Sequence, residues 1–211
     1  KDSRGSTPLL SIVTTHEREV IQMSQERNQR KRKLIDRDTE VVIANNTYGM
    51  FVWESRNGDT SIVLDEHGDE EFITYGELRK LKKYLTNMDI VITAVNSEEG
   101  DVSIMDIARG LRIRKTYEDY FKIIENLDED EAEDVENIDA DAIEDFILDS
   151  DVDDYKEAFD SSLKETIIET SVELYKRHEL GDHGKIRLIQ KSRPEDERGD
   201  FWSDIDASNE D

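Results

Sequence analysis

The sequence predicts an α+β fold in which a small twisted β-sheet or partial barrel, with one helix packed on it, is followed by a helical module and flanked by extended arms at both ends. Apolar residues recur with a period of two before Gly100 and of about 3.6 after it, as strands and amphipathic helices require. Only 35% of the 211 residues are apolar and 38% are charged, so the core must be small. The formal net charge of -25 is concentrated in one stretch, which separates the regions of the chain.

Residues 1–37 carry nine basic and five acidic side chains and lack a periodic apolar face. Residues 11–15 could add a strand to a neighbour, and residues 26–37 have the composition of a polar helix or an extended basic arm. Ordering a backbone costs about 1–2 kcal/mol per residue, and little apolar burial is available here to offset it. We therefore expect a partner to order this arm, by contact with its basic residues Arg30, Lys31, Arg32 and Lys33.

Residues 38–96 are expected to form the β-rich core domain. They contain five runs rich in strand-forming residues, at 40–44, 50–54, 61–64, 71–74 and 88–95. Asn57 and Gly58 tolerate the positive φ of a tight turn, which predicts a hairpin between the second and third runs. A second turn at 67–69 leads into the fourth run.

One helix is predicted inside this β-rich domain. Thr74 and Glu77 have the spacing of a capping box, and the helix they open runs to about Leu85. Strand alternation requires some of residues 51–53 to face outward, and an outward aromatic such as Trp53 would mark an interface. The predicted core residues are Phe51, Val52, Trp53, Ile62, Leu64, Phe72, Leu78, Leu81, Ile90 and Ile92.

Residues 97–127 are predicted to be a helical segment. A first helix begins at Ser103 and ends near Gly110, and Thr116 is expected to cap a second helix that continues through Leu127. The pair resembles a helix-turn-helix in spacing only. The second helix is short and its surroundings are acidic, which argues against a DNA-reading role.

Residues 128–192 are predicted to be an acidic helical module, and 125–160 is the most acidic stretch of the chain. This stretch carries eighteen acidic side chains and one basic side chain. Such a density of like charge is typical of a solvated or partly disordered connector, and the alternatives are a docking strip for a basic partner or a cation site. The residues of this stretch expected to contact a partner in the second case are Asp128, Glu129, Asp130 and Glu131.

The same stretch partly matches the spacing of a calcium-binding loop, because aspartates alternate from Asp149. The loop pattern fails at its sixth position, where Asp154 replaces the glycine of a sharp turn. It fails again at its twelfth position, where Asp160 replaces a bidentate glutamate. We therefore do not predict a calcium site.

Three helices are expected in the acidic module, and a disordered tail after it. The helices are 140–148, then 162–178 with a capping box at Ser162 and an end at Gly181, then 184–191 before Pro194. The tail at 193–211 is acidic and is predicted to be disordered rather than folded. Its aromatic pair, Phe201 and Trp202, has the character of a short linear anchor for a partner.

Composition and motifs exclude several function classes. The absence of cysteine rules out disulfides, cysteine-bound metals and thiol nucleophiles. The four histidines form no catalytic or metal-binding motif, and the ten scattered glycines form no phosphate-binding loop. The acidity disfavours nucleic acid as a partner, and no apolar run is long enough for a membrane helix. The sequence therefore predicts no enzyme, no cofactor and no metal site.

Two stretches carry a resemblance to a known family. VVIANNTYGMFVWE, followed by LDEHGDEEFITYGELRKLKK, places an Asn-rich turn, an aromatic strand, a Gly-Asp-Glu turn and a Thr-x-Gly-Glu-Leu helix start in succession. The C-terminal pattern runs from AIEDFIL through SLKETIIETSVELYKRHEL to KIRLIQK. Over roughly residues 38–191 the chain resembles a family of structural proteins of tailed bacteriophages, typically large myophages of Gram-positive hosts.

The resemblance implies a non-enzymatic component of the virion, made in the host cytoplasm, whose function is contact with other virion structural proteins. Self-association, and a place in capsid, neck, tail or baseplate, stay open alternatives. No catalytic or cofactor-binding residue is implied, and no membrane partner. The charge alone supports a rival hypothesis, a soluble acidic regulator that mimics nucleic acid and inhibits a basic partner.

Overall fold

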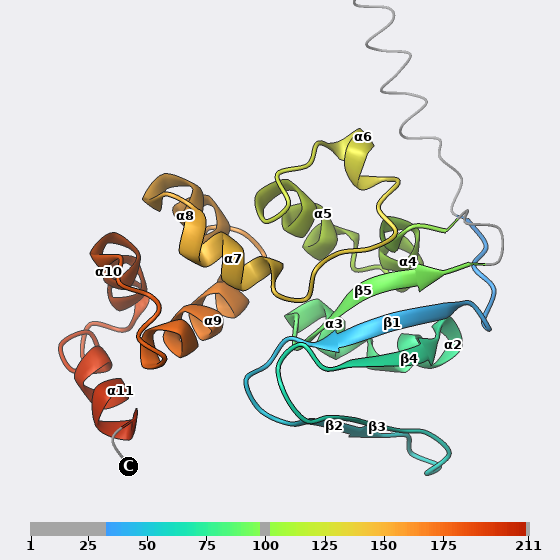
Figure 1. The fold of residues 1–211 in the computed structure, drawn as a ribbon, viewed down its shortest axis with the longest axis horizontal. Helices are drawn as coiled ribbons and strands as arrows, with labels where there is room; N and C mark the ends of the chain where they lie inside the picture. Colours follow the sequence, from blue (N-terminus) through green and yellow to red (C-terminus); the bar gives the residue numbers. More distant parts are fainter. Residues whose placement is uncertain (1–32, 98–101, 210–211) are drawn as a thin grey trace, which may run out of the picture. The chain divides into compact units, whose positions relative to one another are not determined.

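The computed structural model describes residues 33–97 and 102–209 of the chain (Figure 1). All helices and strands named below belong to one compact unit, Leu34–Asp211. Arg30, Lys31, Arg32 and the strand predicted at 11–15 lie outside the described residues. Lys33, the first described residue, is exposed and precedes an irregular segment.

The five strands predicted within residues 38–96 are confirmed, and they form a three-stranded sheet and a separate two-stranded hairpin. In the antiparallel sheet the central strand β1 pairs with β4 on one side and β5 on the other. Four of the six β1 residues are apolar and all four are buried. The strands are β1 (Glu40–Asn45), β2 (Phe51–Glu54), β3 (Ser61–Leu64), β4 (Glu70–Thr74) and β5 (Ile90–Asn96).

The hairpin β2–β3 alternates strictly between its two faces. Phe51 pairs with Leu64 on the buried face, and Val52 pairs with Val63 on the exposed face. Gly58 has a φ of +71°, the positive value that the predicted turn needs. Trp53 shares the face of Phe51 and packs against the core. Val52 is the outward residue of this strand and is 58% exposed, so its prediction as a core residue is wrong.

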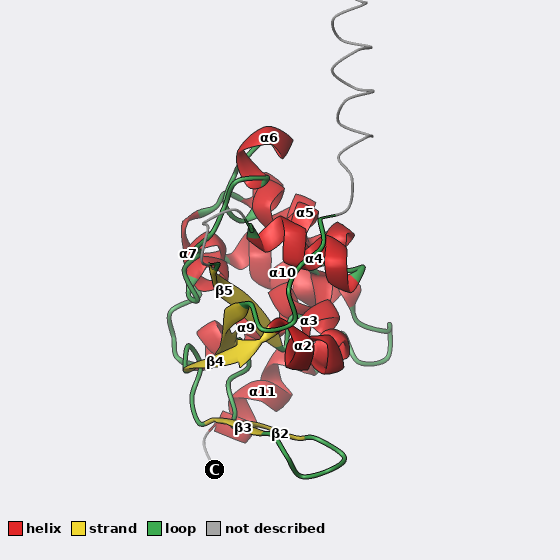
Figure 2. Cartoon of the chain, turned by 90° about the vertical axis from the view of Figure 1, so that its right-hand side faces the viewer, coloured by secondary structure: helices red, strands yellow, loops and turns green. Residues whose placement is uncertain are grey.

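We call residues 34–97 the β-rich half and residues 102–209 the helical half. The helix predicted in the β-rich half is confirmed as a nearly continuous run of α2 (Tyr75–Leu78), the short 3-10 turn η1 (Arg79–Leu81) and α3 (Lys82–Asn87). The Thr74 hydroxyl accepts the Glu77 N–H at 3.3 Å, the first half of the expected capping box. Leu78, Leu81 and Leu85 are fully buried. α2 and α3 lie on one side of the sheet, together with the later helix α4 (Ile104–Leu111) (Figure 2).

Phe72 does not belong to the core, contrary to the prediction. It is 63% exposed, whereas its neighbour Ile73 is 4% exposed. Alternation along β4 turns Ile73 toward the helices and Phe72 toward the opposite face. Because β4 is an edge strand of the sheet, that face leaves Phe72 open to solvent.

Two helices follow the sheet, α4 (Ile104–Leu111) and α5 (Arg114–Ile123). Ser103 opens α4 through a capping box with Asp106, as expected from its position. Thr116 does not cap α5, because the helix begins two residues earlier and Thr116 lies buried in its first turn. The helix also stops before Leu127, and Asn126 beyond it takes a left-handed conformation with φ 53°.

The acidic stretch is folded, which corrects the prediction of a solvated connector. It forms α6 (Glu129–Ala132), α7 (Ala142–Asp149) and α8 (Val152–Phe159), and Ile143, Ile147 and Tyr155 are buried. Many of its acids lie in first helical turns, where the free N–H groups and the helix dipole favour negative charge.

Asp151 shows why the alternating aspartates form no calcium loop. Its carboxylate caps α8 by accepting the N–H groups of Asp153 and Asp154, both at 2.9 Å. The segment therefore continues as a helix and not as an ion-binding turn. Within the described residues no group of three or more histidine or acidic side chains is placed to hold a metal ion.

The segment between α6 and α7 lies beside β5 (Figure 1). Val95 donates its N–H to the carbonyl of Glu136 at 3.1 Å, and Ile138 donates to the carbonyl of Thr93 at 2.8 Å. These bonds satisfy part of the open edge of β5, which would otherwise offer unpaired backbone groups to another chain. The acidic stretch therefore also completes the sheet.

The last helices are α9 (Lys164–Lys176), α10 (His183–Ser192) and α11 (Phe201–Asn209). Ser162 forms no capping box at α9, because its N–H and hydroxyl donate instead to the Asp119 carboxylate at 3.1 and 2.7 Å. The helix is followed by His178 in the left-handed region, at φ 61°, and so does not need Gly181 for its end. The predicted α10 is confirmed.

The acidic tail also folds, as α11, where disorder was predicted. The Trp202 ring packs on the Tyr175 ring with centroids 4.4 Å apart, and its indole N–H donates to the carbonyl of Ile186 at 3.3 Å. Phe201 lies under the Arg193 guanidinium at 4.5 Å. The aromatic pair thus holds α11 against α9 and α10.

One hydrophobic core runs through the β-rich half and the helices, from Ile35 to Ile189. The Tyr117 hydroxyl on α5 accepts the N–H of Ile92 on β5 at 3.0 Å. The Thr166 hydroxyl on α9 donates to the carbonyl of Asn87 at 3.1 Å. Among the helices that the structure describes, none has both the length and the apolar character to cross a membrane.

Candidate functional site: an acidic groove

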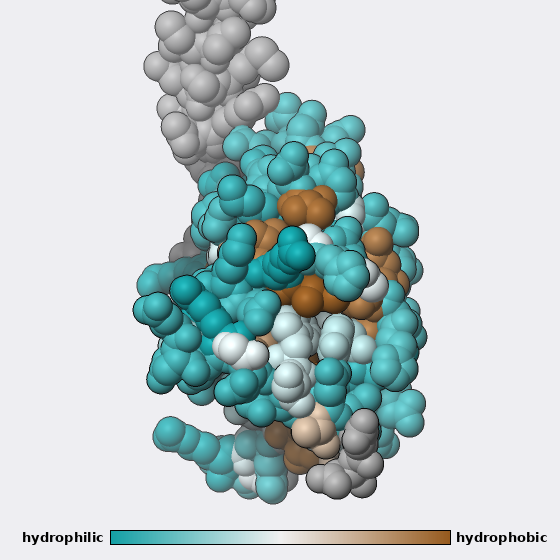
Figure 3. Space-filling model, turned by 90° about the vertical axis from the view of Figure 1, so that its left-hand side faces the viewer, coloured by the Kyte–Doolittle hydropathy of each residue, from teal (hydrophilic) through white to brown (hydrophobic). Residues whose placement is uncertain are grey.

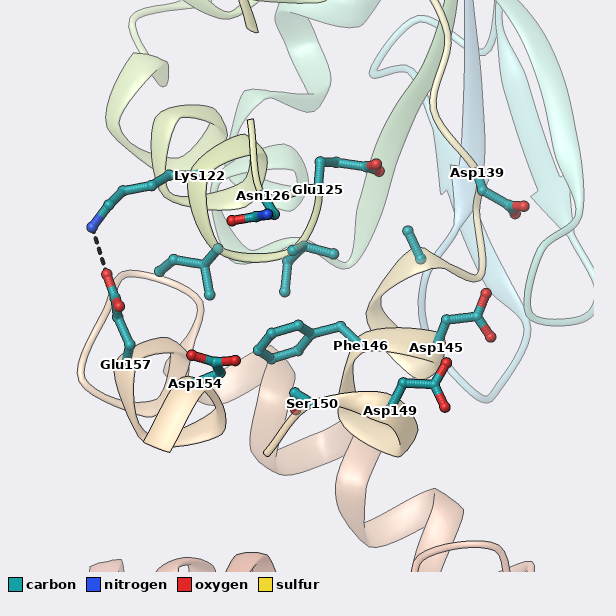
Figure 4. A pocket seen from close by; sticks show the side chains of 13 residues that line it. Lys122, Glu125, Asn126, Asp139, Asp145, Phe146, Asp149, Ser150, Asp154 and Glu157 are labelled. Atoms are coloured by element: carbon teal, nitrogen blue, oxygen red, sulfur yellow. Dashed lines mark hydrogen bonds and ion pairs between the residues drawn. The ribbon is translucent and has the colours of Figure 1, made fainter. Parts of the chain in front are cut away.

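An open groove of about 590 Å³ lies between the C-terminal end of α5 and the helices α7 and α8 (Figure 4). We call it the acidic groove. The acidic side chains that line it are Glu125, Asp139, Asp145, Asp149, Asp154 and Glu157. Its other lining residues are Lys122, Ile123, Ile124, Asn126, Ala142, Phe146 and Ser150.

The floor of the acidic groove is apolar. Phe146 reaches from α7 into its middle (Figure 4). Ile143 and Ile147 on the same helix turn into the core, and the intermediate position leaves Phe146 partly buried. Ile123 and Ile124 at the end of α5 are likewise partly buried and belong to the lining. Apolar surface is thus accessible from solvent inside an acidic rim.

Carboxylates stand on both sides of this floor (Figure 4). Glu125, Asp139, Asp145 and Asp149 lie on the side toward the sheet, and Asp154 and Glu157 lie on the α8 side. Glu157 is paired with Lys122 across the groove. None of the other five carboxylates forms an ion pair with a lysine or arginine among residues 33–97 and 102–209.

Glu125 is the carboxylate of the groove whose environment is least favourable to charge. Burial raises its pKa, and the nearby charge of Asp139 raises it further. A hydrogen bond from the Tyr120 hydroxyl, at 3.3 Å, acts in the opposite direction. Burial also raises the pKa of Tyr120 well above its ordinary value, so this hydroxyl keeps its proton to donate. A cationic group bound beside Glu125 would relieve the repulsion.

A buried lysine fixes the corner between α7 and α8 behind the groove. Lys185 of α10 is 1% exposed, and its ammonium donates to the carbonyls of Ile147 and Ser150 at 2.6 and 2.5 Å. These carbonyls belong to the C-terminal end of α7, where a cation also interacts favourably with the helix dipole. Burial lowers the pKa of Lys185, while Asp182 and Asp149 raise it. The corner that carries Asp149 and Asp154 is thereby held in place.

The residues proposed from sequence for partner binding are not brought together. Asp128 and Glu131 form the reciprocal capping box of α6, and Glu129 and Asp130 are exposed on the same short helix. None of these four lines the acidic groove. Trp53, Phe201 and Trp202 contact the body of the protein itself.

The groove was missed because its acids come from separate elements. Asp145 with Asp149, and Asp154 with Glu157, are the pairs with a local signal, since residues three or four apart lie on one helix face.

A second polar cluster joins the turns of the sheet to α7 and α9. The Tyr48 hydroxyl donates to one Glu144 oxygen at 2.8 Å, and Arg177 donates to the other at 2.6 Å. His67 stacks on Tyr48 with centroids 4.7 Å apart, and its Nε2 lies 3.4 Å from an Asp141 oxygen. Burial raises the pKa of Tyr48, which therefore stays a donor. The cluster connects the two halves.

No protein-family model, no curated protein and no solved structure matches this chain. The resemblance to phage structural proteins therefore stays a prediction that depends on the residues quoted for it. The geometry of the acidic groove is independent of that resemblance.

Proposed function

We propose that this chain is a non-enzymatic structural component of a tailed bacteriophage particle, which binds other virion proteins through its folded body. The observation that carries the proposal is the acidic groove, in which an accessible apolar floor lies between two sets of carboxylates. Five of these carboxylates have no ion-pair partner among the described residues. Such a surface is suited to holding a partner, because apolar contact gives affinity and charge gives orientation.

Further exposed apolar residues support a role in contact. Val52, Val63 and Phe72 of the β-rich half are 58%, 49% and 63% exposed. On the face that carries α10 and α11, apolar patches are enclosed by hydrophilic surface (Figure 3). Contiguous apolar surface rimmed by polar residues is characteristic of protein interaction sites.

The second candidate is a soluble acidic regulator that mimics nucleic acid on a basic partner. The observation that favours it is the row of exposed carboxylates along α7 and α8, which includes Asp145, Asp149, Asp153 and Asp154. The negative charge that this role requires does not account for the accessible apolar floor of the groove. We therefore rank it second.

Mass spectrometry of purified phage particles tests the proposal. A structural component is expected in the particles at a fixed copy number relative to other virion proteins. A regulator is expected in the infected-cell lysate and absent from the particles. Absence of the chain from purified particles would overturn the virion role.

A further inference from the structure

We infer that the acidic groove binds a Lys/Arg-rich segment of a neighbouring protein that carries one apolar side chain between its basic residues. The inference rests on the proposed function only in taking the neighbour to be a virion subunit. The chemistry of the segment follows from the groove itself.

The central apolar side chain is required by the floor. Phe146 lies in the middle of the groove, with Ile123 and Ile124 in the same lining. All three are partly buried, so their apolar surface is available to a partner. An aliphatic or aromatic side chain placed there would remove apolar surface of both molecules from water, which is the main source of affinity in such contacts.

Basic residues on both sides of that side chain are required by the rims. Glu125, Asp139, Asp145 and Asp149 lie on one side of Phe146, and Asp154 lies on the other (Figure 4). Burial raises the pKa of Glu125 and the charge of Asp139 raises it further, so a cation bound beside Glu125 would favour its charged form. Lys122 is already paired with Glu157, so the cations must come from the partner.

The groove disfavours other classes of ligand. Nucleic acid would place phosphates against the acidic rims, which is repulsive. Within the described residues no three histidine or acidic side chains are placed to coordinate one metal ion, so the carboxylates are spread along the rims. Carboxylates on both sides of an apolar floor suit a polypeptide segment that carries basic side chains on both sides of an apolar one.

The groove is formed before a partner arrives. The buried Lys185 ammonium holds the end of α7 through two carbonyls, and Asp151 caps α8 directly after it. Asp119 ties α5 to the start of α9 through Ser162. Because the walls are fixed, binding orders only the partner segment, which lowers the entropic cost of association.

Fluorescence anisotropy with the full chain and three labelled peptides tests the inference. The peptides are KKGLGKK, KKGGGKK without the apolar side chain, and EEGLGEE with reversed charge. We expect KKGLGKK to bind about tenfold more tightly than KKGGGKK, because one leucine side chain is removed from water. EEGLGEE should not bind. The affinity for KKGLGKK should fall as ionic strength rises.

A matched pair of double variants locates the site. Asp145→Asn/Asp154→Asn removes one exposed carboxylate from each side of the floor and should weaken KKGLGKK binding about fivefold. Glu40→Gln/Glu71→Gln removes the same charge from exposed strand positions outside the groove and should leave binding nearly unchanged. Thermal unfolding of both variants shows whether either has altered the fold.

Three results would overturn the inference. They are equal binding of KKGLGKK and KKGGGKK, equal weakening by the two double variants, and displacement of the peptide by calcium at matched ionic strength. The proposed function is tested separately. If the chain is found in particles but its groove shows no preference for the leucine peptide, only the inference fails. If the groove prefers the leucine peptide but the chain is absent from particles, only the virion role fails.

Discussion

The β-rich half, residues 34–97, and the helical half, residues 102–209, share one hydrophobic core but use acidic side chains differently. In the β-rich half, acids occupy turns and the exposed ends and faces of strands, such as Glu40, Asp69 and Glu71. In the helical half, acids are dense enough to predict disorder, yet the segment folds. Net charge alone therefore does not decide whether a segment folds.

The difference lies in where a helix can accommodate negative charge. Asp128 and Asp151 satisfy free N–H groups at the starts of α6 and α8, so these carboxylates take part in folding. Most of the remaining acids face solvent, and the partly buried Glu144 accepts hydrogen bonds from Tyr48 and Arg177. Ile143, Ile147 and Tyr155 provide the buried side. An amphipathic pattern with few apolar residues suffices when capping and exposure remove the cost of charge. The surplus carboxylates line the acidic groove.

The largest expected effect tests whether the two halves are one folding unit. Ile43→Ala in β1 and Ile147→Ala in α7 each remove a fully buried side chain and should each cost about 3 kcal/mol. Because the halves share a core, each substitution should shift the unfolding of both halves together. Trp53 fluorescence in a Trp202→Phe background follows the β-rich half, and far-ultraviolet circular dichroism follows the helices.

The same measurement can separate the halves. If Ile147→Ala melts the helices while the Trp53 signal keeps its original midpoint, the helical half is an independent module. Phe72→Ala is the control, because its side chain is exposed. This substitution should change the free energy of unfolding by no more than about 0.5 kcal/mol with either probe.

The next effect concerns the link between α5 and α9. Asp119→Asn weakens the hydrogen bonds from Ser162 and should cost about 2 kcal/mol at neutral pH. Burial opposes the charge, but the bonds from Lys115 and Ser162 lower the pKa of Asp119 overall. A lowered folded-state pKa contributes stability above the ordinary carboxyl pKa of about 4, and this is lost as pH falls through the folded-state value.

Acid titration of stability therefore checks the role of Asp119. The difference in unfolding free energy between the native chain and Asp119→Asn should be full at neutral pH and shrink below about pH 4. A difference that is independent of pH would mean that the charge of Asp119 contributes nothing. The Glu71→Gln variant serves as the control, because Glu71 is exposed.

A smaller effect tests the account of how the acidic segment folds. Asp151→Ala removes the cap of α8 and should cost about 1 kcal/mol. Asp153→Ala removes an exposed aspartate two residues later and should cost less, although both variants reduce the negative charge equally. Chemical denaturation compares the two. If Asp153→Ala and Asp151→Ala stabilise the protein alike, relief of repulsion outweighs capping and the comparison of the halves must be revised.

The β-rich half was predictable because its signals are local. The run at 40–44, the Asn57–Gly58 turn and the Thr74 helix start each depend on residues adjacent in sequence. Phe72 was wrongly predicted to belong to the core, because its exposure depends on the position of β4 at the sheet edge. No local sequence pattern shows that position. Thr116 and Ser162 are residue types that commonly cap helices. Thr116 is instead buried inside α5, and Ser162 donates to the distant Asp119 carboxylate.

The helical half and the groove depend on contacts between distant segments. The polar sequence around Trp202 does not predict that its ring packs on Tyr175 or that its N–H donates to the carbonyl of Ile186. Lys185 belongs to an ordinary amphipathic helix, and nothing in the sequence of that helix predicts its burial against the end of α7. The acidic groove combines the end of α5 with α7 and α8, and only the fold places Glu125 near Asp139.

The smallest effect separates the groove from the rest of the acidic surface. Glu125→Gln removes a carboxylate whose pKa is raised by burial and by Asp139, and the amide can still accept from Tyr120. A raised folded-state pKa means that stability is lost as pH rises through that value, so the native chain carries the cost at neutral pH. Glu125→Gln should thus stabilise the protein by about 0.5 kcal/mol at neutral pH, since solvent screens this partly exposed group. The gain should vanish below about pH 4.

Chemical denaturation of Glu125→Gln and the native chain at neutral pH and below pH 4 measures this gain. The same variant should also weaken binding of KKGLGKK. A variant that loses stability at neutral pH would show that Glu125 is favourably placed in the free protein, and the argument that the groove awaits a cation would then fail.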